Sequence, residues 1–90
     1  MIDFEWNPDK AAENLKKHGV SFSEAAPVFA DPLAITIFDP DHSDNEERFL
    51  LLGRSTPRRL IVISHTDRSG IIRIISARLA NRGERLQVRV

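Results

Sequence analysis

The chain has 90 residues, of which 41% are hydrophobic and 29% are charged, and its formal net charge is zero. This composition is typical of one globular domain spanning residues 1–90 and excludes an intrinsically disordered chain. The absence of cysteine excludes disulfides and thiolate chemistry. No apolar run approaches the roughly 18 residues of a membrane span, so we expect a cytoplasmic protein without membrane contact.

Charge is divided unequally between the two halves of the chain. Residues 1–47 carry eleven of the thirteen acidic residues and all three lysines, which gives a net charge of −8. Residues 48–90 carry all ten arginines and two acidic residues, which gives +8. This segregation indicates either an anionic partner or two halves that pair within one fold. The exclusive use of arginine favours the anionic partner, because the planar guanidinium suits bidentate contacts with phosphate.

The first third of the chain predicts one strand and two helices. Apolar residues alternate with acidic ones over residues 2–6, which predicts a short strand. An Asn-Pro start and a terminal glycine predict a helix over residues 8–18. The next helix should begin at Ser21 or Ser23. It should be short or bent, because Pro27 has no amide proton to donate.

From residue 33 the apolar pattern changes to a period of two. It predicts four consecutive strands, at residues 33–38, 48–54, 60–65 and 71–77. Consecutive strands with short connections favour an antiparallel meander. The predicted order is therefore β-α-α-β-β-β-β-α, an α+β domain with a mainly antiparallel twisted sheet. Two N-terminal helices should pack on one face, and a C-terminal helix should follow the last strand.

The C-terminal segment predicts a helix that presents a ladder of arginines. On a helical wheel, four arginines fall within a sector of about 60°: Arg78, Arg82, Arg85 and Arg89. Gly83 would weaken such a helix and could end it early. The ladder indicates contact with nucleic acid or a partner protein, or simply a solvated face.

The candidate chemistry rests on arginine and histidine. Alternation places Arg48 and Arg54 on one face of their strand, and His65 and Arg73 could share that face near the end of the sheet. Such a set could catalyse phosphoryl transfer, because a histidine can accept a proton from a hydroxyl while guanidinium groups stabilise charge on phosphorus. In RNA the adjacent 2′-hydroxyl would be the nucleophile. No metal-ligand spacing or nucleotide-binding loop occurs, so we expect neither a metal nor a cofactor.

Each of these residues also has a structural alternative. His65 could be a surface or hydrogen-bonded residue at a strand end. Arg73 could be an internal ion-pair partner for Glu46, Glu47 or Asp3, because a buried charge without a partner is costly.

Several blocks of the sequence resemble a known family. The segments FEWNPDKAAENLKKHGVSFSEAAPVF, DPLA, DPDHSDNEERF and IRIISARLANRGER are similar, in this order, to the BrnT toxins of bacterial type II toxin–antitoxin pairs. The resemblance implies a RelE-like fold and a metal-independent ribonuclease that arrests translation. It also implies inhibition by a BrnA-like antitoxin with a ribbon-helix-helix domain, through which the complex would bind its operon DNA.

The resemblance also identifies the positions of charged motif residues, which are Lys10, His18, Glu46, Glu47, Arg48, His65, Arg73, Arg78, Glu84 and Arg85. Combined with the strand pattern, it predicts that Arg73 and Arg48 or Arg54 bind the scissile phosphate, with His65 as general base or acid. It further predicts RNA-backbone contacts, which are assigned to Lys10, Arg78, Arg82 and Arg85. After Glu84-Arg85 the chain departs from the family pattern and has no tyrosine, which argues against base stacking by the terminal segment.

One other function fits the sequence, and a third is less well supported. A catalytically weak binding module could pair with the antitoxin and act as an operon co-repressor. Independent DNA binding is disfavoured, because there is no helix-turn-helix pattern and the net charge is not basic.

Overall fold

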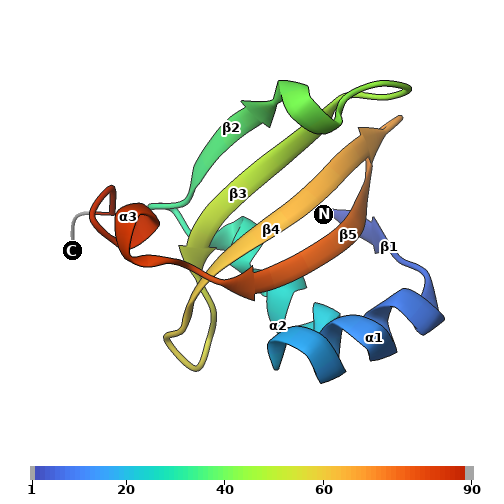
Figure 1. Ribbon diagram of the computed structural model, residues 1–90. Helices are drawn as coiled ribbons and strands as arrows, with labels where there is room; N and C mark the ends of the chain where they lie inside the picture. Colours follow the sequence, from blue (N-terminus) through green and yellow to red (C-terminus); the bar gives the residue numbers. More distant parts are fainter. Residues whose placement is uncertain (1, 89–90) are drawn as a thin grey trace.

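The structure is a computed structural model that describes residues 2–88. Its elements are β1 (Asp3–Glu5), α1 (Pro8–His18), α2 (Phe22–Ala25), η1 (Ala26–Ala30), β2 (Ile35–Asp39), η2 (Pro40–His42), β3 (Arg48–Arg54), β4 (Leu60–Arg68), β5 (Ile71–Leu79) and α3 (Arg82–Arg85), η1 and η2 being 3₁₀ turns. The α+β class is confirmed. Figure 1 shows α1 and α2 together on one side of a curved sheet, with α3 at the end of the sheet away from the β2–β3 loop.

The five strands form one mixed sheet in the order β1-β5-β4-β3-β2. The four strands from β2 to β5 are antiparallel neighbours, whereas β1 pairs parallel with β5. The first strand of the chain therefore lies beside the last one. In the sequence, the helices follow β1 at one edge of the sheet and lead to β2 at the other edge (Figure 1).

The main core lies between the helices and one face of the sheet, which we call the helix-covered face. The helical segments and the loop before α2 contribute Val20, Phe22, Ala25 and Val28; the strands contribute Leu51, Ile61, Ile63, Ile74 and Ala77. The opposite face, called the open face, carries a smaller buried cluster made of Leu52, Leu60, Val62 and Ala80. Burial of apolar surface is thus much greater on the helix-covered face, and the open face is left for other contacts.

The second helix is short and bent, as expected from Pro27. Ser21 caps α2 by accepting a hydrogen bond from the amide of Glu24. The chain then passes directly into the 3₁₀ turn η1, in which Pro27 lies at an early position whose amide need not donate.

A β-bulge in β5 reverses the faces to which its side chains point. Ser64 pairs with Ser76, but the next residue of β4, His65, pairs with Ile74, so Ile75 is an extra residue in β5. Ala77 and Ile74 are consequently both buried on the helix-covered face although they are three residues apart. Arg73, which would share the face of Ala77 in a regular strand, points to the open face.

The predicted C-terminal helix with an arginine ladder is wrong. Strand β5 continues to Leu79, with Arg78 paired opposite Val62, and α3 comprises only Arg82–Arg85. The break occurs because the Asn81 side chain and Glu84 form a reciprocal capping box that starts a new helix. Arg78, Arg82 and Arg85 therefore do not share a helical face. Arg89 and Val90 lie outside the described residues.

Asn14 joins α1 to β5. Its side-chain amide nitrogen donates to the carbonyl oxygens of Val20 (2.9 Å) and Ala77 (2.8 Å), and its amide oxygen accepts from the backbone nitrogen of Ala77 (3.1 Å). Strand β1 pairs with β5 only as far as Arg73, so Asn14 satisfies backbone groups that β1 does not reach. The position of α1 beside the sheet depends on this buried side chain.

Replacement of Asn14 by alanine should strongly destabilise the fold. The substitution removes three buried hydrogen bonds between the Asn14 side chain and backbone groups. We therefore expect the free energy of unfolding to fall by about 2–4 kcal/mol. Urea denaturation measures this change. The matched control Asn45→Ala, at an exposed loop position, should change it by less than about 0.5 kcal/mol. Equal stability of the two variants would contradict this role of Asn14.

Candidate functional site

A row of side chains crosses the open face near one end of the sheet. Asp39 of β2 pairs with Arg48 of β3, Thr66 of β4 pairs with Arg73 of β5, and Arg73 pairs with Glu5 of β1. The β3–β4 register places Arg48 beside Thr66. We call these five residues the cross-strand row. It brings Arg48 and Arg73 together from strands that are distant in sequence.

Three arginines, Arg48, Arg68 and Arg73, line one hollow together with the Glu46 carboxylate. Glu46 accepts hydrogen bonds from Nε (3.0 Å) and Nη2 (2.7 Å) of Arg68. These bonds lower the pKa of Glu46, and the nearby charges of Arg48 and Arg73 lower it further. A concentration of arginine that holds a carboxylate is also suited to hold a phosphate.

Glu5 supplies a second carboxylate to this cluster, at longer distances from the guanidinium groups than Glu46. Its Oε1 lies 3.6 Å from Nη1 of Arg73 and 3.9 Å from Nη1 of Arg68. Arg73 is thus an ion-pair partner, as the alternative expected, but the expected carboxylates, Glu46, Glu47 and Asp3, were wrong, because Glu5 takes that place. The Arg73 side chain keeps 30% of its surface exposed, so it is accessible to a ligand.

The first turn of α1 contributes to the same site. Asn7 and Lys10 line a hollow of about 170 Å³ together with Arg48, Arg68 and Arg73. Asn7 is the N-cap, and its side chain accepts from the amides of Asp9 and Lys10. The positive end of the helix and the Lys10 side chain thus add to the positive potential of the site.

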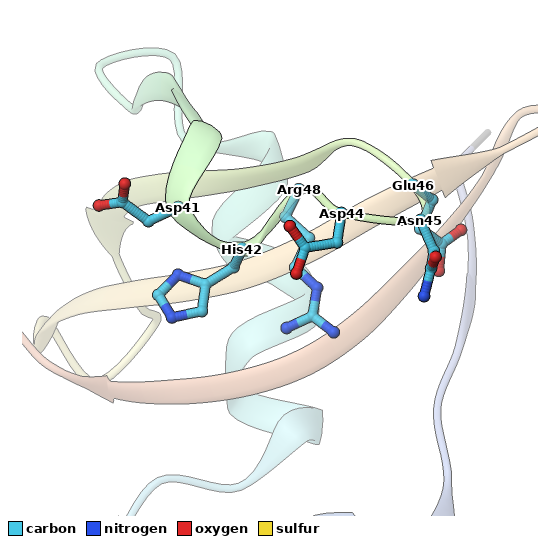
Figure 2. Close-up of a pocket in the computed structure, with 6 residues that line it drawn as sticks. All are labelled: Asp41, His42, Asp44, Asn45, Glu46 and Arg48. Atoms are coloured by element: carbon cyan, nitrogen blue, oxygen red, sulfur yellow. The ribbon is translucent and has the colours of Figure 1, made fainter.

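A second hollow, of about 250 Å³, adjoins the first on the side of the β2–β3 loop (Figure 2). It is lined by Asp41, His42, Asp44, Asn45, Glu46 and Arg48. Glu46 and Arg48 line both hollows, so these are neighbours. In Figure 2 the His42 ring and the Arg48 guanidinium extend to the same side of the loop.

His42 is the functional candidate that sequence reasoning missed. Its Nδ1 lies 2.8 Å from Oδ2 of Asp39, and 67% of its side chain is exposed. The signal in the sequence was the spacing of Asp39 and His42, three residues apart across Pro40, which allows a single 3₁₀ turn to bring them together.

The expectation that His65 joins the arginines on one face is wrong. His65 pairs with Phe49, whose face is opposite to that of Arg48, and the bulge in β5 moves Arg73 away from it as well. The His65 ring is buried on the helix-covered face, with centroid distances of 4.8 Å to Phe29 and 5.8 Å to Phe49. Neither ring nitrogen has a hydrogen-bond partner among residues 2–88.

Arg54 is also separated from the site. It ends β3 opposite Leu60, six residues from Arg48, which corresponds to about 20 Å along a strand. There it lines a different hollow together with Arg58 and Arg85. Of the predicted phosphate-binding pairs, the structure brings together Arg48 and Arg73.

The remaining predicted residues are distributed over the molecule. Arg78 donates to both carboxylate oxygens of Glu84, at 2.8 and 2.9 Å, and this pairing raises its pKa. Arg82 and Arg85 are exposed on α3, at the end of the sheet where β5 finishes. His18 lines another hollow beside α1, which Lys10 also lines.

Within residues 2–88, no group of three or more histidine, aspartate and glutamate side chains is arranged to hold a metal ion. In the same part of the chain, no helix has the length and apolar character needed to cross a membrane.

Comparison with known proteins places this chain in a family. Residues 6–84 match the family model described as a ribonuclease toxin of type II toxin–antitoxin systems, BrnT. The chain belongs to the BrnT family. The fold is similar to that in the crystal structure of the Brucella abortus ribonuclease toxin BrnT, with a TM-score of 0.69 and 20% sequence identity, over 91% of this chain and 100% of that one. No curated protein matches the sequence significantly.

The buried His65 should make stability depend on pH. Burial lowers its pKa from 6.5 to about 4, so between these values the unfolded chain binds a proton that the folded chain does not. Stability should therefore fall as pH decreases from 6.5 towards 4, by up to about 3 kcal/mol from this group. Urea denaturation at several pH values should show a steeper loss for the wild type than for His65→Leu. Identical pH dependence of the two proteins would contradict this account.

Proposed function

We propose that this chain is an endoribonuclease toxin that binds the scissile phosphate of RNA at the cross-strand row. The observation that carries the proposal is the gathering of Arg48, Arg68 and Arg73 around the Glu46 carboxylate. A phosphodiester has the same charge and similar acceptor geometry, so RNA would replace Glu46 between these guanidiniums. Membership of a family of ribonuclease toxins supports this interpretation.

Cleavage would proceed without a metal ion through attack of the 2′-hydroxyl on the adjacent phosphorus. Arg48 and Arg73 would stabilise the negative charge that develops on the phosphate oxygens. This electrostatic stabilisation is stronger in a partly desolvated site than in water. Lys10 and Arg68 would hold the neighbouring phosphates. The exposed Arg82 and Arg85 would contact RNA further along, whereas Arg78 is held by Glu84 and positions α3.

The biological role proposed here follows from this activity. The toxin would cleave RNA in the cytoplasm and so inhibit translation, on a fold of the RelE type. A BrnA-like antitoxin with a ribbon-helix-helix domain would neutralise it, and the complex would contact DNA only through the antitoxin.

A second candidate function is that of a catalytically weak antitoxin partner and co-repressor. The observation that favours it is an apolar strip on the open face between β2 and α3, to which Ile35, Ile37, Leu50, Leu52 and Val62 contribute. Ile37 is 53% exposed, and an apolar strip of this kind suits a protein partner better than RNA. Growth arrest on expression alone would favour the ribonuclease, and complex formation without arrest would favour the partner.

Loss of either arginine of the cross-strand row should abolish most of the cleavage. With RNA and purified protein in EDTA, Arg48→Ala and Arg73→Ala should each lower the rate by about 10²–10³. Arg54→Ala, which removes the same charge at the other end of β3, should stay within about threefold of the wild type. Gel electrophoresis of labelled RNA measures these rates. Equal cleavage by all four proteins, or none by the wild type, would contradict the proposal.

A further inference from the structure

We propose that His42, oriented by Asp39, is the general base that accepts the proton of the attacking 2′-hydroxyl. This inference rests on the proposed ribonuclease function. It assigns the proton acceptor, which the arginines cannot supply. A guanidinium stays protonated at any relevant pH and therefore cannot accept that proton.

The fold places His42 beside the cross-strand row. Asp39 ends β2 opposite Arg48, so its side chain belongs to the open face. The 3₁₀ turn Pro40–His42 brings the imidazole back over Asp39. The Ser43 hydroxyl accepts a hydrogen bond from the backbone nitrogen of Arg48, at 2.9 Å, which ties the loop to β3.

The contact between Asp39 and His42 determines the tautomer of the imidazole. An ionised carboxylate can only accept hydrogen bonds, so Nδ1 of His42 carries the proton and donates it across the 2.8 Å contact. Nε2 of the neutral ring then has a free lone pair. The Asp39 side chain is 14% exposed and that of His42 is 67% exposed, so a shielded carboxylate orients an accessible base.

The base and the phosphate-binding groups line two adjoining hollows. His42 and Arg48 line the same hollow (Figure 2). Arg48 also lines the hollow that Arg73 lines. His65 lacks this relation, because the sheet separates it from both arginines and its nitrogens are buried. Geometry therefore favours His42 over His65 as the proton acceptor.

The reaction balances with these groups. Nε2 of His42 takes the proton of the 2′-hydroxyl as the 2′-oxygen forms a bond to phosphorus. The bond from phosphorus to the 5′-oxygen breaks, and that oxygen takes a proton from water in the open hollow. The resulting hydroxide is neutralised by the imidazolium proton, which leaves a 2′,3′-cyclic phosphate and a 5′-hydroxyl.

The hollow around His42 is also lined by other charged groups. Besides Asp39, these are Asp41, Asp44, Glu46 and Arg48. Because these charged groups share one hollow, the pH profile of cleavage is compared between the wild type and the His42 variant.

The test compares cleavage of a labelled RNA by four proteins: wild type, His42→Ala, Asp39→Asn and Arg73→Ala. We expect His42→Ala to lose about 10²-fold or more in rate and to lose one ionisation from the pH–rate profile. Free imidazole should restore part of its activity, because the vacated position is exposed. Asp39→Asn, at a positioning residue, should lose about tenfold and shift that ionisation, and Arg73→Ala should not respond to imidazole.

The outcomes separate this inference from the proposed function. Wild-type rate and pH profile in His42→Ala, together with loss of cleavage in Arg73→Ala, would overturn the role of His42 and leave the ribonuclease intact. His42→Ala could instead cleave slowly, keep the wild-type pH profile and not respond to imidazole. This result would show that His42 only supports the loop structurally, and it would also overturn the proposed role as general base. Absence of cleavage by the wild type would overturn both proposals. Thermal unfolding of each variant verifies that the fold is retained.

Discussion

The arrangement of the candidate site depends on the single extra residue in β5. Ile75 shifts the alternation of the strand, so that Ile74 enters the main core and Arg73 turns to the open face. Without it, Arg73 would lie under the helices, where an arginine would need a buried partner. A bulge costs one regular pair of backbone hydrogen bonds, and here it places a charge where a ligand can reach it.

The two faces of the sheet have different physical roles. The helix-covered face carries the aromatic and aliphatic core, including His65, whose neutral ring fills space between Phe29 and Phe49. The open face carries the charged groups. Its arginines are partly neutralised by Glu5 and Glu46 from the acidic half of the chain, so both interpretations of the charge segregation apply. The halves pair with each other, and they still leave a concentration of guanidinium groups at one end.

The sequence was informative where local rules decide the structure. Strand β3 has the predicted bounds, Arg48–Arg54, because an apolar run flanked by two arginines and preceded by a polar loop defines them. The bend near Pro27 followed from a missing amide proton. The face of Arg73 could not be predicted, because a one-residue bulge leaves no trace in the composition of β5. The face of His65 follows from the β3–β4 register, which pairs it with Phe49 and not with Arg48. The prediction of a long C-terminal helix was wrong for a related reason. A helical wheel gives Arg78 and Arg82 the same angular positions even when, as here, a strand ends between them.

The central claim is that RNA phosphate binds between Arg48 and Arg73 on the open face. Its most direct test is a crystal structure of the protein with a short RNA whose 2′-hydroxyls are methylated and therefore cannot attack. We expect a phosphate in contact with Arg48 and Arg73, with the Glu46 carboxylate displaced from Arg68. Phosphates bound only near Arg54 and α3, with the Glu46–Arg68 pair intact and the cross-strand row empty, would contradict it.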